Sequence, residues 1–179
     1  VSKATAFNFI PISLCAHYED FTGAAGRFVF SDYPKDGVLT TQQVAAAYKQ
    51  YLESLSPESL SELGNYVTPD VHFADPFNDV HGVGAMRHIF DGMFKSISNI
   101  EFKVDCIGVD RSTALMAWTF SGELGGRSFM LNGMSQISFD ASGRVTAHID
   151  HWDSATQFYL RLPVIGWLLS IVHRRVAAH

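Results

Sequence analysis

The feature that most constrains the fold is a change of hydrophobic period part-way along the chain. Between residues 40 and 97, apolar side chains recur at helical spacing in three stretches, interrupted by a short alternating run at 71–75. Beyond residue 100 the period becomes two, in four runs separated by turn residues: 100–109, 113–123, 127–139 and 144–152. Two helices, a strand, a third helix and an antiparallel meander predict an α+β domain.

The length of 179 residues fits one such domain, and 47% hydrophobic residues exclude wholesale disorder. We expect an irregular, aromatic-rich arm over 1–39, the domain over 40–153 and a helical tail over 154–179. The tail is expected to pack on the domain or across a dimer seam, with lipid contact as the alternative. A net charge of −5 argues against a nucleic-acid partner.

Cysteine use and hydropathy bear on location. The two cysteines, Cys15 and Cys106, form no disulfide framework and have no metal-ligand spacing, so the sequence predicts reduced core thiols in a cytoplasmic protein. No window holds eighteen consecutive apolar residues, so stable membrane insertion is not expected.

Three segments carry a family resemblance: the run from Val71 to Phe77 (VHFADPF), the dipeptide His81-Gly82 and the late strand from Val145 to Asp153. Together they resemble the nuclear transport factor 2-like superfamily, in its ketosteroid isomerase and SnoaL-like polyketide cyclase branch. The resemblance implies a cone-shaped fold in which a curved antiparallel sheet wraps three helices around one deep apolar pocket. It also implies a homodimer.

Ketosteroid isomerases place a catalytic aspartate after the first strand, directly before a proline-containing turn, and a tyrosine on the first helix. By this resemblance Asp75 is the base and Tyr51 the oxyanion donor. Such a pair moves a proton next to a carbonyl while the phenol stabilises the enolate oxygen. The family's second acid falls on Ser135, so the oxyanion site lacks one member.

A second constellation lies on the last strand. A period of two sends His148, Asp150 and Trp152 to one face, where His148 and Asp150 would act as an orienter and base pair and Trp152 as an apolar wall. The residues expected to bind a hydrophobic ligand are Phe73, Phe90, Phe94, Trp118, Ser135 and Trp152.

Each assignment has a structural alternative. Asp75 can instead accept the amides of its own turn, Tyr51 can be a core residue, and His148 with Asp150 can be a buried pair that ties the sheet together. Asp75, His148 and Asp150 lack metal-ligand spacing, so no metal and no cofactor are expected.

The function expected from the sequence is that of a cofactor-free isomerase, cyclase or lyase acting on a small hydrophobic carbonyl compound. A non-catalytic binding protein for a small hydrophobic ligand is the first alternative. A protein-interaction scaffold of the transport-factor type is the second.

Overall fold

The computed structural model describes residues 40–158, which contain every helix and strand discussed below. The predicted arm at 1–39 and most of the predicted tail, from residue 159 onward, lie outside the described residues. No helix within the described part is long and apolar enough to cross a membrane.

The described chain begins with helices that pack on the sheet. Their bounds are α1 (Thr41–Glu53), the 3₁₀ turn η2 (Ser59–Glu62) and α2 (Leu63–Tyr66), followed after two strands by α3 (Val83–Ser96). Thr40 caps α1 in a capping box, since its Oγ1 accepts from the Gln43 amide and Gln43 Oε1 accepts from the Thr40 amide. Of the two helices predicted before the first strand, the second is a 3₁₀ turn followed by a single α-helical turn.

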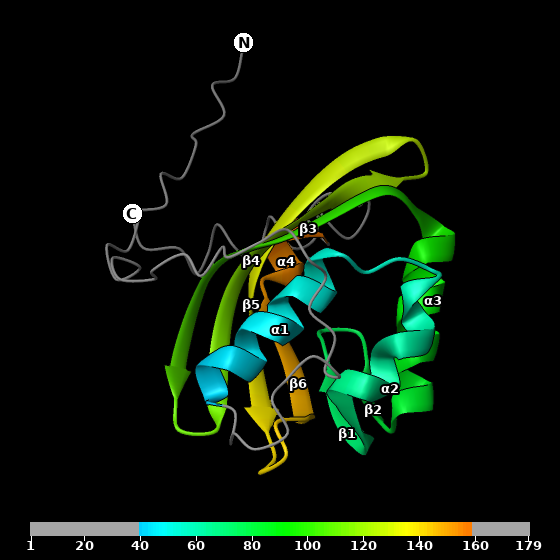
Figure 1. Cartoon of the computed structure of the whole chain (residues 1–179). Helices are drawn as coiled ribbons and strands as arrows, with labels where there is room; N and C mark the ends of the chain where they lie inside the picture. The colour runs from blue at the N-terminus through cyan, green and yellow to red at the C-terminus, as the bar shows by residue number, and fades with distance from the viewer. Residues whose placement is uncertain (1–39, 159–179) are drawn as a thin grey trace, which may run out of the picture.

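Six strands form one sheet in the order β2-β1-β6-β5-β4-β3. Their bounds are β1 (Val67–Ala74), β2 (Asp79–His81), β3 (Ile97–Asp110), β4 (Thr113–Leu124), β5 (Arg127–Phe139) and β6 (Val145–Trp152). The long strands arch over α1 toward α3 (Figure 1), and both helices contact the sheet. This is the curved α+β architecture that the sequence predicted.

Two features of the sheet differ from the sequence prediction. The meander β3 to β6 is antiparallel, but β1 joins it by parallel pairing with β6, so the sheet is mixed. The residues Asp79–His81, which the sequence did not predict as a strand, form the short edge strand β2 against β1. Three residues carry too little alternation to be recognised as a strand; pairing with β1 creates it.

The tight turn between β4 and β5 follows its sequence signal closely. Gly125 and Gly126 both have positive φ, at 58° and 76°, and join strands whose last pair is Leu124 with Arg127. A two-residue loop with two left-handed positions matches the twist of an antiparallel hairpin. The turn therefore fixes the register of both long strands.

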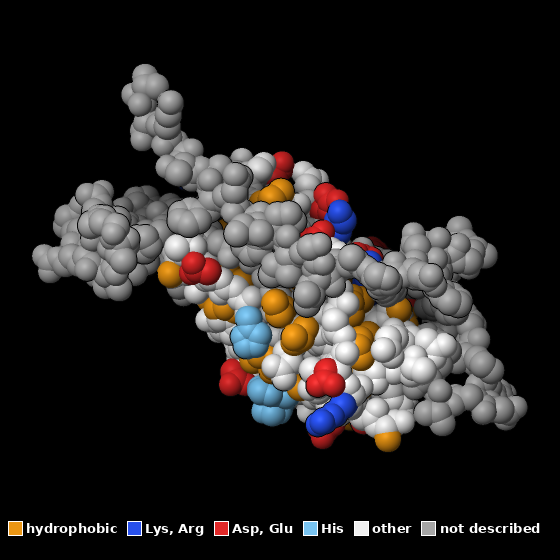
Figure 2. Space-filling model, turned by 90° about the vertical axis from the view of Figure 1, so that its left-hand side faces the viewer, with side chains coloured by type: hydrophobic (Ala, Val, Ile, Leu, Met, Phe, Trp, Pro, Cys, Tyr) orange, Lys and Arg blue, Asp and Glu red, His pale blue; other side chains and the backbone are white. Residues whose placement is uncertain are grey.

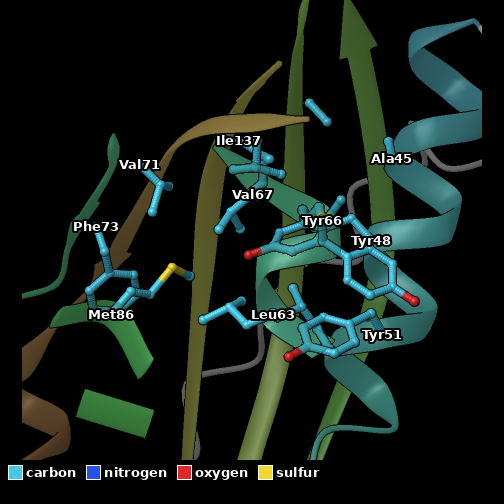
Figure 3. Close-up of a cluster of buried hydrophobic side chains, with 14 of the residues drawn as sticks. Ala45, Tyr48, Tyr51, Leu63, Tyr66, Val67, Val71, Phe73, Met86 and Ile137 are labelled. Carbon is cyan, nitrogen blue, oxygen red and sulfur yellow. The ribbon is translucent and has the colours of Figure 1, made fainter. Parts of the chain in front are cut away.

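The core lies between the sheet and the helices. Figure 3 shows part of this core, where the rings of Tyr48, Tyr51 and Tyr66 pack together. Phe73 and Met86 join the cluster from β1 and α3. Tyr51 and Tyr66 stack with ring centroids 4.2 Å apart. Burying such large rings supplies much of the apolar area that holds the helices on the sheet.

Cys106, in β3, is disulfide-bonded. The prediction of a reduced thiol is therefore wrong for this residue. No other cysteine lies within residues 40–158. The prediction of a cytoplasmic location depended on reduced cysteines, and this structure does not support that argument. The location stays a prediction.

Candidate functional site

A cavity of about 940 Å³ lies between the sheet and the helices. Its wall is mostly apolar and aromatic, with Phe73 from β1, Phe90 and Phe94 from α3, Trp118 from β4 and Trp152 from β6. Volumes of several hundred Å³ with few polar groups are typical of sites for small hydrophobic molecules. All five of these residues were predicted to bind ligand from the sequence.

Strand β6 contributes three side chains to this wall, namely His148, Asp150 and Trp152. Alternation along a strand places every second residue on one face, so the placement expected from the sequence is found. The intervening Ile149 and His151 are directed to the outer face of the sheet.

Five side chains form a continuous hydrogen-bonded network at the cavity wall. The phenol of Tyr48 lies 2.9 Å from Nδ1 of His148, and Nε2 of His148 lies 3.0 Å from Oδ1 of Asp150. Ser135 Oγ donates to the same Oδ1 at 2.5 Å, and Trp118 Nε1 donates to Ser135 Oγ at 2.8 Å. The network thus runs from α1 through β6 and β5 to β4.

The protonation state of Tyr48 bears on which groups of the network donate hydrogen bonds. Burial raises the pKa of its phenol well above the ordinary value, and the neighbouring Tyr51 and Asp150 raise that pKa further. The phenol therefore keeps its proton and can donate it to Nδ1 of His148. Nε2 of the same ring faces the carboxylate of Asp150, so both ring nitrogens have hydrogen-bond partners.

Asp150 is the carboxylate of the network, and it lines the cavity together with His148 and Trp118. Its side chain is 20% exposed, whereas His148 is 3% exposed as a residue. Oδ1 accepts from both Ser135 and His148, and no side chain or amide within residues 40–158 donates to Oδ2. One oxygen is anchored and the other is open to a ligand, which is the arrangement that a general base requires.

Asp75 also lines the cavity, but its carboxylate is engaged by its own turn. Oδ1 accepts from the amides of Phe77 and Asn78, both at 2.7 Å, and Asn78 Nδ2 donates to both oxygens at 3.0 Å. This is the turn role that the sequence offered as the alternative to base catalysis. Asp75 follows directly on the register pair Ala74–Ile149, so it lies beside Asp150 across the parallel strands.

Tyr51 and Ser135 do not line the cavity. The Tyr51 phenol is buried and donates to the Ser59 carbonyl oxygen at 3.3 Å, while Ser135 is buried behind the wall and bonds two residues that line it, Trp118 and Asp150. Sequence reasoning missed Tyr48, which lies one helical turn before Tyr51 on the same apolar stripe. Only its contact with His148, a hundred residues away, distinguishes the two.

A family model described as a SnoaL-like domain matches residues 48–148, more than half of the chain. The chain belongs to the SnoaL-like domain family. The match includes Tyr48, Trp118, Ser135 and His148 and ends before Asp150. No curated protein sequence matches the chain.

Solved structures share the fold. An LEH-like epoxide hydrolase from M. tuberculosis is 19% identical, with a TM-score of 0.55, and the match covers 77% of this chain and 96% of that one. A SnoaL-like polyketide cyclase from Agrobacterium tumefaciens is 18% identical, with a TM-score of 0.53 and coverage of 64% and 92%. A protein with a ketosteroid isomerase-like fold from Catenulispora acidiphila is 12% identical, with a TM-score of 0.56 and coverage of 66% and 91%. Identities this low establish the SnoaL-like fold alone.

Proposed function

We propose that this SnoaL-like protein is a cofactor-free acid–base catalyst for a small hydrophobic carbonyl compound, an isomerase, cyclase or lyase with Asp150 as the base. The observation that carries the proposal is the carboxylate of Asp150 at the cavity, with Oδ1 held by Ser135 and His148 and Oδ2 directed to no protein donor among residues 40–158. Fixed orientation next to an apolar binding space is what makes a carboxylate effective in proton transfer.

The proton transfer uses only groups at the site. Oδ2 of Asp150 takes a proton from the carbon next to the substrate carbonyl, which leaves an enolate and a neutral carboxylic acid. The acid returns the proton to another carbon in an isomerisation, or to a departing hydroxyl in an elimination. His148 and Ser135 keep the carboxyl group in place throughout, because both bond the oxygen that does not react.

The reassignment from Asp75 to Asp150 follows from their hydrogen bonds. Both oxygens of Asp75 are held by Asn78, whereas Asp150 keeps one oxygen open. Two structural neighbours are named as an epoxide hydrolase and a polyketide cyclase. Both names are those of enzymes, which supports an enzymatic role for this cavity.

A second candidate is a non-catalytic binding protein for a small hydrophobic ligand. The observation in its favour is that Tyr51, the expected oxyanion donor, bonds Ser59 and does not line the cavity. A cavity with an apolar wall and no dedicated donor for an enolate binds a ligand without turning it over.

The test measures hydrogen–deuterium exchange at carbons next to the carbonyl in a panel of hydrophobic ketones. We expect the wild-type protein to accelerate exchange and Asp150→Asn to lose about 10²- to 10⁴-fold of that acceleration, the usual contribution of a positioned base. Asp75→Asn is the matched control, since it changes the other carboxylate of the same cavity, and is expected to retain most of the exchange.

Ligand binding is followed in parallel by the fluorescence of Trp118 and Trp152, which line the cavity. Full exchange in Asp150→Asn would overturn the assignment of the base. Binding without exchange by the wild-type protein would favour the carrier, and neither binding nor exchange would favour a protein-interaction scaffold.

A further inference from the structure

The β1–β2 hairpin brings two histidines and an aspartate together on the side away from the cavity. His72 is paired directly with His81, and Ala74 is paired with Asp79, so the three polar side chains share one face of the hairpin. The opposite face carries Phe73, which is buried and lines the cavity. The cluster is therefore separate from the site described above.

The three side chains lie close enough together to be brought around one metal ion. Nε2 of His72 lies 2.7 Å from Oδ1 of Asp79, and the rings of His72 and His81 stack with centroids 4.4 Å apart at 10°. One ligand atom from each residue lies within 4.8 Å of the other two. Ligands at about 2.0–2.1 Å around a tetrahedral ion are roughly 3.4 Å apart, so on binding the His72–Asp79 hydrogen bond opens and the stacked rings turn toward the ion.

The surroundings leave the cluster available to an ion. Asp79 is 75% exposed at its side chain, and its one ion-pair partner among residues 40–158 is His72. The hairpin is held in register by its ladder, by the turn of Asp75 with Asn78 and by the Gly82 amide, which donates to the Val71 carbonyl at 2.8 Å. A pre-formed backbone keeps the three ligands together before an ion arrives.

We propose that His72, Asp79 and His81 bind a divalent transition-metal ion of the zinc class, with water in the remaining coordination positions. Two imidazoles and one carboxylate favour Zn²⁺, Cu²⁺ or Ni²⁺ over Mg²⁺ and Ca²⁺, which prefer oxygen ligands. The bound ion clamps the edge strand β2 to β1 and stabilises the turn that leads to the cavity. It takes no part in the proton transfer, because it lies on the other face of the hairpin.

The test is a zinc titration of the full chain, without a histidine tag and after removal of metal with a chelator. Isothermal calorimetry follows binding, and two-dimensional NMR of the imidazole nitrogens identifies the ligands. We expect one saturable site, shifts of the His72 and His81 ring nitrogens, and no comparable binding of Mg²⁺.

The variants His81→Ala and Asp79→Asn change exposed side chains, so folding should be preserved. Each is expected to weaken zinc binding at least tenfold, whereas His88→Ala, an exposed histidine on α3, should leave it unchanged. Zinc affinity equal to wild type in both hairpin variants, or ring-nitrogen shifts confined to other histidines, would overturn the proposal.

Discussion

At the scale of single residues, the site depends on which of two neighbouring tyrosines reaches which partner. Tyr48 and Tyr51 lie one helical turn apart on α1, and both are buried. Tyr48 donates to His148 at 2.9 Å, whereas Tyr51 donates to a backbone carbonyl at a longer 3.3 Å. The first bond is part of the network that orients Asp150, and the second is a local tie between α1 and the following turn.

Tyr48→Phe is therefore expected to be more costly than Tyr51→Phe. Removal of the Tyr48 hydroxyl leaves the buried Nδ1 of His148 without its donor, and an unsatisfied buried polar group costs about 1–3 kcal/mol. Loss of the weaker Tyr51 bond should cost about 0.5–1.5 kcal/mol. Urea unfolding of the two variants measures the difference, and equal losses of stability would contradict the network.

At the scale of elements, β4, β5 and β6 set the position of Asp150 together. Trp118 on β4 pairs with Gly133 on β5, and Ser135 on β5 pairs with Asp150 on β6. The absence of a side chain at Gly133 lets the indole lie over β5, where its Nε1 reaches Ser135. A Cβ at Gly133 would come within 2.4 Å of the Trp118 ring.

We expect Gly133→Ala to displace the Trp118 indole and weaken its bond to Ser135. Overpacking of this kind costs about 1–3 kcal/mol. Urea unfolding measures the stability, and near-UV circular dichroism reports the environment of the indole. Gly108→Ala is the matched control, because a Cβ at that strand glycine meets nothing within 4 Å. Unchanged stability and spectrum in Gly133→Ala would show that the close approach is not required.

At the scale of the whole molecule, the outer face of the sheet carries exposed apolar side chains. Figure 2 shows hydrophobic side chains among charged ones on the side where β3 and β4 lie. Leu115 and Met134 are 47% and 43% exposed. Met134 pairs with Ala117, which lies two residues from Leu115 on the same strand, so both side chains lie on one face of the sheet. Met130 lies on that face too, four residues before Met134. Large apolar side chains exposed on one sheet face are candidates for an interface.

The sequence resemblance implies a homodimer, and we propose that this face mediates it. Sedimentation velocity of the wild-type protein should give twice the monomer mass of 19.8 kDa. The double variant Leu115→Glu, Met134→Glu should be monomeric, because two buried carboxylates on each subunit are costly to desolvate. Wild-type protein that sediments as a monomer at all concentrations would contradict the proposal.

The sequence by itself determined the local structure, because helical and strand periods and turn residues act over short distances. The α1 cap at Thr40, the apolar stripe of α1, the Gly125-Gly126 turn and the inward face of β6 could all be read from neighbouring residues. The family resemblance added the cone-like architecture. The fold and part of the cavity wall were therefore predictable.

Tertiary structure decided the chemistry within that wall, since it depends on contacts between residues far apart in the chain. Parallel pairing of β1 with β6 brings Asp75 beside Asp150, and a contact across a hundred residues selects Tyr48 over Tyr51. The antiparallel pairing of β1 with β2 places His72 opposite His81. No local period encodes these pairings; they are fixed only when apolar faces are buried against one another.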